Sequence, residues 1–94
     1  MAFEVRLSDE AQQDLRGLRA YDRAAILELA DRLLANDPLT ESRARIKRLR
    51  QPAPAQFRLR VGDFRVFYDV SESVVKVIRI LPKQNAVRFA EGLL

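Results

Sequence analysis

The sequence contains no cysteine and no histidine among its 94 residues. Without cysteine, the chain has no disulfide framework and no thiolate metal site. Without histidine, it lacks the side chain that ordinarily titrates nearest to neutral pH, which excludes a two-histidine nuclease, a Ser-His-Asp hydrolase and a histidine-ligated zinc site. Any catalysis must therefore depend on arginine, lysine, tyrosine, carboxylates or the substrate itself. We expect no metal and no other cofactor.

Long apolar runs are also missing. No segment approaches the roughly 20 apolar residues that a transmembrane helix needs. The first seven residues alternate and include Glu4, unlike a signal peptide. A hydrophobic content of 48% is enough for one core and a charged content of 32% is enough for its surface. We therefore expect a single domain over residues 1–94, located in the cytoplasm.

The net charge of +4 is unevenly distributed along the chain. Residues 1–42 carry 5 basic and 9 acidic side chains, residues 43–65 carry 8 and 1, and residues 66–94 carry 4 and 3. The basic side chains of the middle quarter are Arg43, Arg45, Lys47, Arg48, Arg50, Arg58, Arg60 and Arg65. Such a concentration is either a solvated basic loop or an electrostatic footprint for nucleic acid or an acidic partner.

The first half of the chain predicts a strand followed by a helical hairpin. Alternation predicts a strand over residues 2–7, and Ser8 is a suitable N-cap for a helix over residues 9–19. Asp22 is the expected N-cap of a second helix, which ends at residues 36–38. Its apolar stripe is Ile26, Leu29, Ala30, Leu33 and Leu34.

The second half predicts three strands, over residues 56–61, 64–70 and 74–81. Before them, residues 39–50 form a basic run with Leu39, Ile46 and Leu49 as possible anchors, and residues 51–55 form a stiff loop. After Pro82, residues 83–85 are a predicted turn and residues 86–94 a frayed helix or strand end. The predicted fold is α+β with the order β-α-α-β-β-β: a helical hairpin packs on one face of a small, mostly antiparallel sheet, and a short C-terminal segment follows.

Alternation also predicts which side chains share a face of the sheet. The core face receives Phe57, Leu59 and Val61 from one strand, and Phe64, Val66, Tyr68 and Val70 from the next. The third strand places Val75, Val77 and Leu81 on one side and Lys76, Ile78 and Ile80 on the other. Arg79 is then either a strand-edge ion pair or a ligand contact. Arg58, Arg60 and Arg65 remain for the opposite face, where their charged, planar forks suit phosphate oxygens.

Three segments resemble the RelE/ParE toxin superfamily. They are the lead-in Arg45-Ile46-Lys47-Arg48-Leu49-Arg50, the block Arg58-Leu59-Arg60-Val61-Gly62-Asp63-Phe64-Arg65-Val66-Phe67-Tyr68, and the late Ile80-Leu81-Pro82-Lys83. The resemblance extends over nearly the whole chain. It is closer to the RelE branch than to the gyrase-directed ParE branch.

The resemblance implies a toxin of a type II toxin–antitoxin system that acts as a ribosome-dependent mRNA endonuclease and inhibits translation. Cleavage in that branch uses the substrate 2′-hydroxyl and no metal. The implied catalytic residues are Arg58, Arg60, Arg65 and Lys83, and the implied RNA-binding residues are Arg45, Lys47, Arg48 and Arg50. The implied partners are the ribosome, mRNA and a small, acidic, partly disordered antitoxin, with operon DNA contacted only through the antitoxin complex.

The chain departs from the family at its C-terminal end. Many RelE-like toxins carry a catalytic tyrosine there, whereas this chain has Val87 or Phe89 in that region. Some members use a lysine as a base, and Lys83 is the corresponding candidate. The departure leaves several functions open: a weak enzyme, one that relies on ribosomal RNA groups, a toxin that binds without cutting, a ParE-like DNA gyrase inhibitor, or a degenerate toxin that serves as an antitoxin partner or non-specific RNA binder. In each toxin reading, we expect the antitoxin to cover the arginines or displace residues 84–94.

Overall fold

The computed structural model describes residues 2–93. In chain order these residues form β1 (Glu4–Leu7), α1 (Asp9–Arg16), α2 (Ala20–Leu34), β2 (Ile46–Arg48), β3 (Phe57–Val61), β4 (Phe64–Ser71), β5 (Val74–Pro82) and α3 (Lys83–Ala90). The strands form one sheet in the order β1-β5-β4-β3-β2. β1 runs parallel to β5, and the other neighbours are antiparallel. The predicted α+β fold is confirmed, with β2 and α3 as additional elements.

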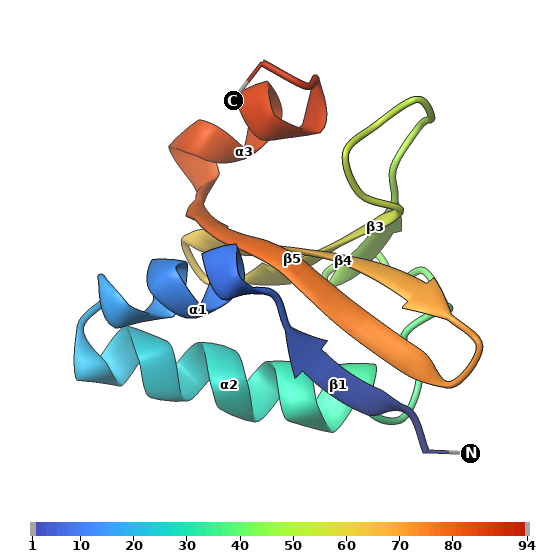
Figure 1. Ribbon diagram of the computed structural model, residues 1–94, viewed down its shortest axis with the longest axis horizontal. Helices are drawn as coiled ribbons and strands as arrows, with labels where there is room; N and C mark the ends of the chain where they lie inside the picture. Colours follow the sequence, from blue (N-terminus) through green and yellow to red (C-terminus); the bar gives the residue numbers. More distant parts are fainter. Residues whose placement is uncertain (1, 94) are drawn as a thin grey trace.

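The sheet separates two layers of unequal size. Figure 1 shows α1 and α2, in blue and cyan, on one side of the sheet, and α3, in red, on the other with the β2–β3 loop. The larger core lies under α1 and α2. It contains buried side chains from both helices and the sheet, namely Ala11, Leu15, Ile26, Leu29, Ala30, Leu34, Ile46, Phe57, Leu59, Val61, Val66, Tyr68, Val75, Val77 and Ile80. The predicted core faces of β3 and β4 are therefore confirmed.

The two helices begin in different ways. The Ser8 hydroxyl accepts a hydrogen bond from the Ala11 N–H at 3.0 Å, as predicted for an N-cap. The prediction for Asp22 was wrong, because α2 begins at Ala20 with Arg19 in the N-cap position. Asp22 lies in the first turn and accepts a hydrogen bond from the Arg19 guanidinium at 3.1 Å. Its negative charge interacts favourably with the helix dipole at this position, although the side chain does not cap the helix.

A β-bulge in β5 changes which side chains face each layer. Phe67 pairs with Arg79 and Tyr68 pairs with Val77, so Ile78 is an extra residue in β5. Alternation therefore restarts after Ile78, and Ile80 joins the larger core, whereas Leu81 faces α3. The predicted faces of Ile80 and Leu81 were wrong for this reason.

The face that was predicted to be left to the arginines carries a second, smaller core. Buried Ala55, Phe67, Leu81, Ala86 and Phe89 form it, and the Phe67 and Phe89 ring centroids lie 4.7 Å apart. Residues 83–85, predicted as a turn, are instead the first turn of α3. Contacts with Phe67, which is distant in the sequence, and with Leu81 at the end of β5 stabilise this eight-residue helix, which would be marginal alone.

The basic run contains a short strand that the sequence did not reveal. Ile46 is buried, but Leu39 is 47% exposed, so Leu39 is not an anchor. β2 is an edge strand, and nearby side chains cover its outer edge: the Ile46 N–H donates to the Ser42 hydroxyl at 3.1 Å and the Arg48 N–H donates to the Glu41 carboxylate at 2.9 Å. Across residues 2–93, no helix combines the length and apolar character needed to cross a membrane.

Candidate functional site

A pocket of about 400 Å³ lies between the sheet and α3. Four of its lining side chains are cationic: Lys47 from β2, Arg58 from β3, Arg65 from β4 and Lys83 from the start of α3. The remaining lining residues are Leu49, Phe67, Ala86, Val87, Ala90 and Glu91. The sheet thus contributes three of the four cations, and α3 contributes Ala86, Val87 and Ala90 together with Lys83 and Glu91. We call this cavity the basic pocket.

Strand register sets like charges directly opposite one another in this region. Lys47 pairs with Arg58 across β2 and β3, and Arg60 pairs with Arg65 across β3 and β4. Like charges directly opposite on a sheet destabilise it. Two such pairs side by side are therefore an electrostatic cost, which a bound anion would remove.

Arg58 lies deepest among these cations. Its Nε atom is buried, and it has no hydrogen-bond partner among the described residues. Burial, followed by the charges of Arg65 and Arg60, lowers the pKa of the Arg58 guanidinium from its ordinary value. Arginine nevertheless stays protonated in proteins, so the side chain remains a cation that lacks an acceptor. Its unpaired N–H is suited to an oxygen of a bound anion.

Arg65 is held in place by main-chain carbonyls. Its Nη1 donates to the Gly62 and Phe64 carbonyls, at 3.0 and 2.9 Å. Gly62 has a φ of 55°, and this left-handed conformation makes the tight turn that brings those carbonyls close. Burial and the Arg60 charge lower the pKa of Arg65, while Asp63 opposes the shift. Arg65 is therefore fixed in orientation beside the pocket.

The other predicted site residues lie in different places, and only some of them line the basic pocket. Lys83 pairs with Asp63 at 3.5 Å, and both side chains are largely exposed. Arg45 donates to the Arg60 carbonyl at 3.1 Å, so its side chain lies along the edge of β3. Arg48 lies on the helical side of the sheet, with its guanidinium carbon 4.6 Å from the Phe57 ring centroid. Arg50 and Arg60 are exposed and do not line the pocket.

Glu91, at the end of α3, is a lining residue that the sequence did not indicate. The sequence analysis predicted no helix over residues 83–90, so it gave no reason to expect Glu91 near the arginines. The signal that could have found it is helical spacing after Pro82, because Ala86, Phe89 and Ala90 are apolar at intervals of three and four.

Tyr68 and Arg79 have structural roles. Tyr68 is buried and donates to the Pro38 carbonyl at 2.6 Å, as expected of a core tyrosine. Burial raises the pKa of the phenol above its ordinary range. Arg79 donates to both carboxylate oxygens of Asp14, at 2.8 and 3.1 Å, and Asp14 also accepts the Ile80 N–H at 2.9 Å. Of the two alternatives for Arg79, the ion pair is therefore correct.

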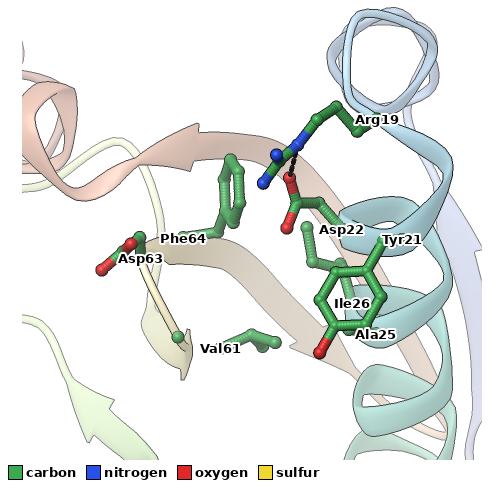
Figure 2. A pocket seen from close by; sticks show the side chains of 9 residues that line it. Arg19, Tyr21, Asp22, Ala25, Ile26, Val61, Asp63 and Phe64 are labelled. Atoms are coloured by element: carbon green, nitrogen blue, oxygen red, sulfur yellow. Dashed lines mark hydrogen bonds and ion pairs between the residues drawn. The ribbon is translucent and has the colours of Figure 1, made fainter.

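A second pocket, of about 450 Å³, lies between the start of α2 and the β3–β4 turn (Figure 2). Figure 2 shows Tyr21, Ile26, Val61 and Phe64 around it. Its lining cation, Arg19, is hydrogen-bonded to Asp22. This pocket therefore lacks the unpaired positive charge that distinguishes the basic pocket.

Comparisons with known proteins agree on one superfamily. The family model described as "ParE toxin of type II toxin-antitoxin system, parDE" matches residues 5–87. Among curated protein sequences, none matches the chain significantly. Among solved structures, the RelBE2 toxin–antitoxin complex of Mycobacterium tuberculosis is similar, with a TM-score of 0.73 and 27% identity over 87% of this chain and 99% of the other.

Two more distant structures share the fold. The archaeal RelE–RelB complex of Pyrococcus horikoshii has a TM-score of 0.71 and 24% identity over 88% of this chain and 97% of the other. An arginine-to-alanine double mutant of Escherichia coli toxin RelE in the free state has a TM-score of 0.68 and 22% identity over 98% and 97%. With the family match over most of its length, this chain belongs to the ParE toxin family of type II toxin–antitoxin systems, in the RelE/ParE superfamily, and has a RelE-like fold.

Proposed function

We propose that this toxin binds mRNA in the basic pocket and cleaves it on the ribosome, which would inhibit translation in the cytoplasm. The observation that carries the proposal is the set of four cations around one pocket, with a buried guanidinium N–H that lacks a partner. A phosphate oxygen would accept that N–H and reduce the repulsion in the Lys47–Arg58 and Arg60–Arg65 pairs.

The chemistry of RNA cleavage suits these residues. The 2′-hydroxyl attacks the adjacent phosphorus, and negative charge increases on the non-bridging oxygens in the transition state. Guanidiniums already held in position stabilise that charge without reorganising. Arg65, fixed by two carbonyls, and Arg58, which lacks an acceptor, are the groups we assign to this task. Lys47 would position the RNA backbone from β2.

An antitoxin is the expected protein partner. Two of the similar structures described above are complexes of a toxin with its antitoxin, which supports a partner of that kind here. An acidic segment that folds on binding would complement the cations of the basic pocket. Covering Arg58 and Arg65, or displacing α3, would each prevent RNA from entering.

The test is induced expression in a bacterial host, followed by primer extension on abundant mRNAs. The wild-type toxin should produce discrete cuts within translated codons, and Arg65→Ala should abolish them. The expected loss is roughly 10²-fold or more in cleavage rate, as for the removal of one preorganised charge donor. Arg16→Ala, which removes an exposed arginine from the last turn of α1, is the matched control and should cut like the wild type.

The proposal is wrong if folded Arg65→Ala cuts as the wild type does. The second candidate function is inhibition of DNA gyrase, favoured by the match to the ParE family model. Growth arrest with intact mRNA and an induced DNA-damage response would select it. Inhibition of supercoiling by purified gyrase would then be the direct measurement.

A further inference from the structure

The C-terminal helix presents one face to the basic pocket. Its lining residues occupy positions 83, 86, 87, 90 and 91, with the three- and four-residue spacing of a single helical face. Of the described residues that line the pocket, Glu91 alone carries a carboxylate. Four cations share the pocket with it, yet Glu91 makes no ion pair within 4.0 Å in residues 2–93. Glu91 therefore lines the pocket while its carboxylate is not held in an ion pair with another described residue.

The backbone at Glu91 is fixed by the way α3 ends. The Gly92 N–H donates to the Phe89 carbonyl at 2.9 Å, and the Leu93 N–H donates to the Arg88 carbonyl at 2.8 Å. Gly92 has a φ of 78°, so the pattern is a Schellman motif with glycine in its left-handed position. Phe89, packed on Phe67, anchors the same turn to the sheet. Glu91 is thus part of a defined helix end.

Cleavage through the 2′-hydroxyl needs a general base, and the other side chains near the pocket are poorly suited to that role. Arginine does not lose its proton, which removes Arg58 and Arg65. Tyr68 is in the core, bonded to Pro38, and does not line the pocket. Lys83 is already engaged by a carboxylate, because its ammonium is paired with Asp63 at 3.5 Å. Glu91, in contrast, brings to the pocket a carboxylate, one of the side-chain groups that act as general bases.

We propose that Glu91 is the general base of this toxin, taking the proton of the attacking 2′-hydroxyl. The inference rests on the proposed function. As the 2′-oxygen loses its proton to the Glu91 carboxylate, it forms a bond to phosphorus and the bond from phosphorus to the 5′-oxygen breaks. That oxygen leaves with the electron pair and takes a proton from the Lys83 ammonium. The products are a 2′,3′-cyclic phosphate and a 5′-hydroxyl, and exchange with water restores both side chains.

The alternative role for Glu91 is that of a counterion for the pocket, and the two roles predict different results. Removing a negative charge from among Lys47, Arg58, Arg65 and Lys83 should strengthen RNA binding in either case. If Glu91 is only a counterion, cleavage should also stay the same or rise. If it is the base, cleavage should fall although binding does not weaken.

The experiment measures cleavage and binding separately for Glu91→Gln and Glu91→Ala. Single-turnover cleavage of an mRNA on programmed ribosomes gives the rate, and fluorescence anisotropy with a short RNA gives the Kd. We expect the rate to fall roughly 10²-fold, the usual contribution of a positioned base, with a Kd that is unchanged or lower. Added formate should partly restore Glu91→Ala, and Glu91→Asp should keep part of the activity. The matched control is Glu72→Gln, at the exposed turn between β4 and β5, which should behave as the wild type.

The outcomes distinguish a failure of the role proposed for Glu91 from a failure of the proposed nuclease function. If the wild type cuts and Glu91→Gln cuts equally fast, the inference is wrong while the nuclease function stands. Weaker binding that accounts for the whole loss, with no rescue by formate, also overturns it. If the wild-type toxin makes no cut on ribosomes, the proposed function itself fails, and the role of Glu91 fails with it.

Discussion

Replacing Arg58 by methionine should stabilise the protein and weaken the RNA binding that we propose for the basic pocket. Arg58 has a buried Nε–H without a partner and lies directly opposite Lys47. A buried donor that lacks a partner costs about 1–3 kcal/mol. Because the guanidinium is partly exposed, solvent reduces the repulsion from its neighbours to roughly 0.2–1 kcal/mol. Methionine keeps a similar apolar stem and removes both costs.

We expect the free energy of unfolding of Arg58→Met to rise by about 1 kcal/mol. With an m-value near 2 kcal/mol/M, this moves the urea midpoint by about 0.5 M, and an increase of this size raises the Tm of a small domain by about 4–8 °C. Arg43→Met is the matched control. The Arg43 side chain is exposed and has no like charge opposite it in the strand pairing, so the free energy of unfolding should change by no more than about 0.5 kcal/mol.

Ligand binding tests the other half of the argument. A short RNA at about 100 times its Kd should stabilise the wild-type protein by about 2.7 kcal/mol, and the same RNA concentration should stabilise Arg58→Met far less. The reasoning is refuted if Arg58→Met has a lower free energy of unfolding than the wild type at an unchanged m-value. In that case Arg58 would be a structural residue, and the cost attributed to its unpaired N–H would be wrong.

Two further predictions concern groups outside the basic pocket. Asp14→Asn should lower the free energy of unfolding by about 1.5–3 kcal/mol, because the Asp14 carboxylate accepts hydrogen bonds from Arg79 and from the Ile80 N–H. Urea unfolding measures the change, with Asp9→Asn as the control. Equally small losses of stability in the two variants would contradict the prediction. Tyr68 has a raised pKa in the folded state, so its stabilising contribution is complete below the ordinary tyrosine pKa, about 10, and is lost as pH rises above it. Tyr68→Phe removes the hydrogen bond to the Pro38 carbonyl and should lower the free energy of unfolding by about 0.5–1.5 kcal/mol. Between pH 10 and 12 the stability of this variant should fall less steeply than that of the wild type. The same pH profile in both proteins would refute the assignment.

The predicted elements that failed did so for identifiable reasons. The faces of Ile80 and Leu81 depended on unbroken alternation, and one extra residue, Ile78, reversed them. The strand β2 has three residues, and its structure depends on pairing with residues of β3 that lie nine to thirteen positions away in the sequence. Helix α3 is eight residues long, and it packs on Phe67 of β4 and Leu81 of β5. Short elements of this kind carry too little local periodicity to be recognised.

The predicted site residues were partly brought together. Lys47, Arg58, Arg65 and Lys83 do line one pocket. Arg48 was grouped with them because it is basic and close in sequence, but it shares the parity of buried Ile46 and therefore lies against Phe57 on the helical side. Charge composition alone does not distinguish the two faces of an edge strand, whereas its pairing register does.

The sequence by itself determined the α+β class, the faces of β3 and β4, and the gathering of arginines opposite the core. These follow from local rules, because a period of two assigns side chains to faces whatever lies beyond them. Only the tertiary structure decided which cations meet, that α3 covers part of the sheet, and that Glu91 reaches the same pocket. Those features depend on strand register, a bulge and packing between residues far apart in the chain, and such contacts form only when the whole sheet is assembled.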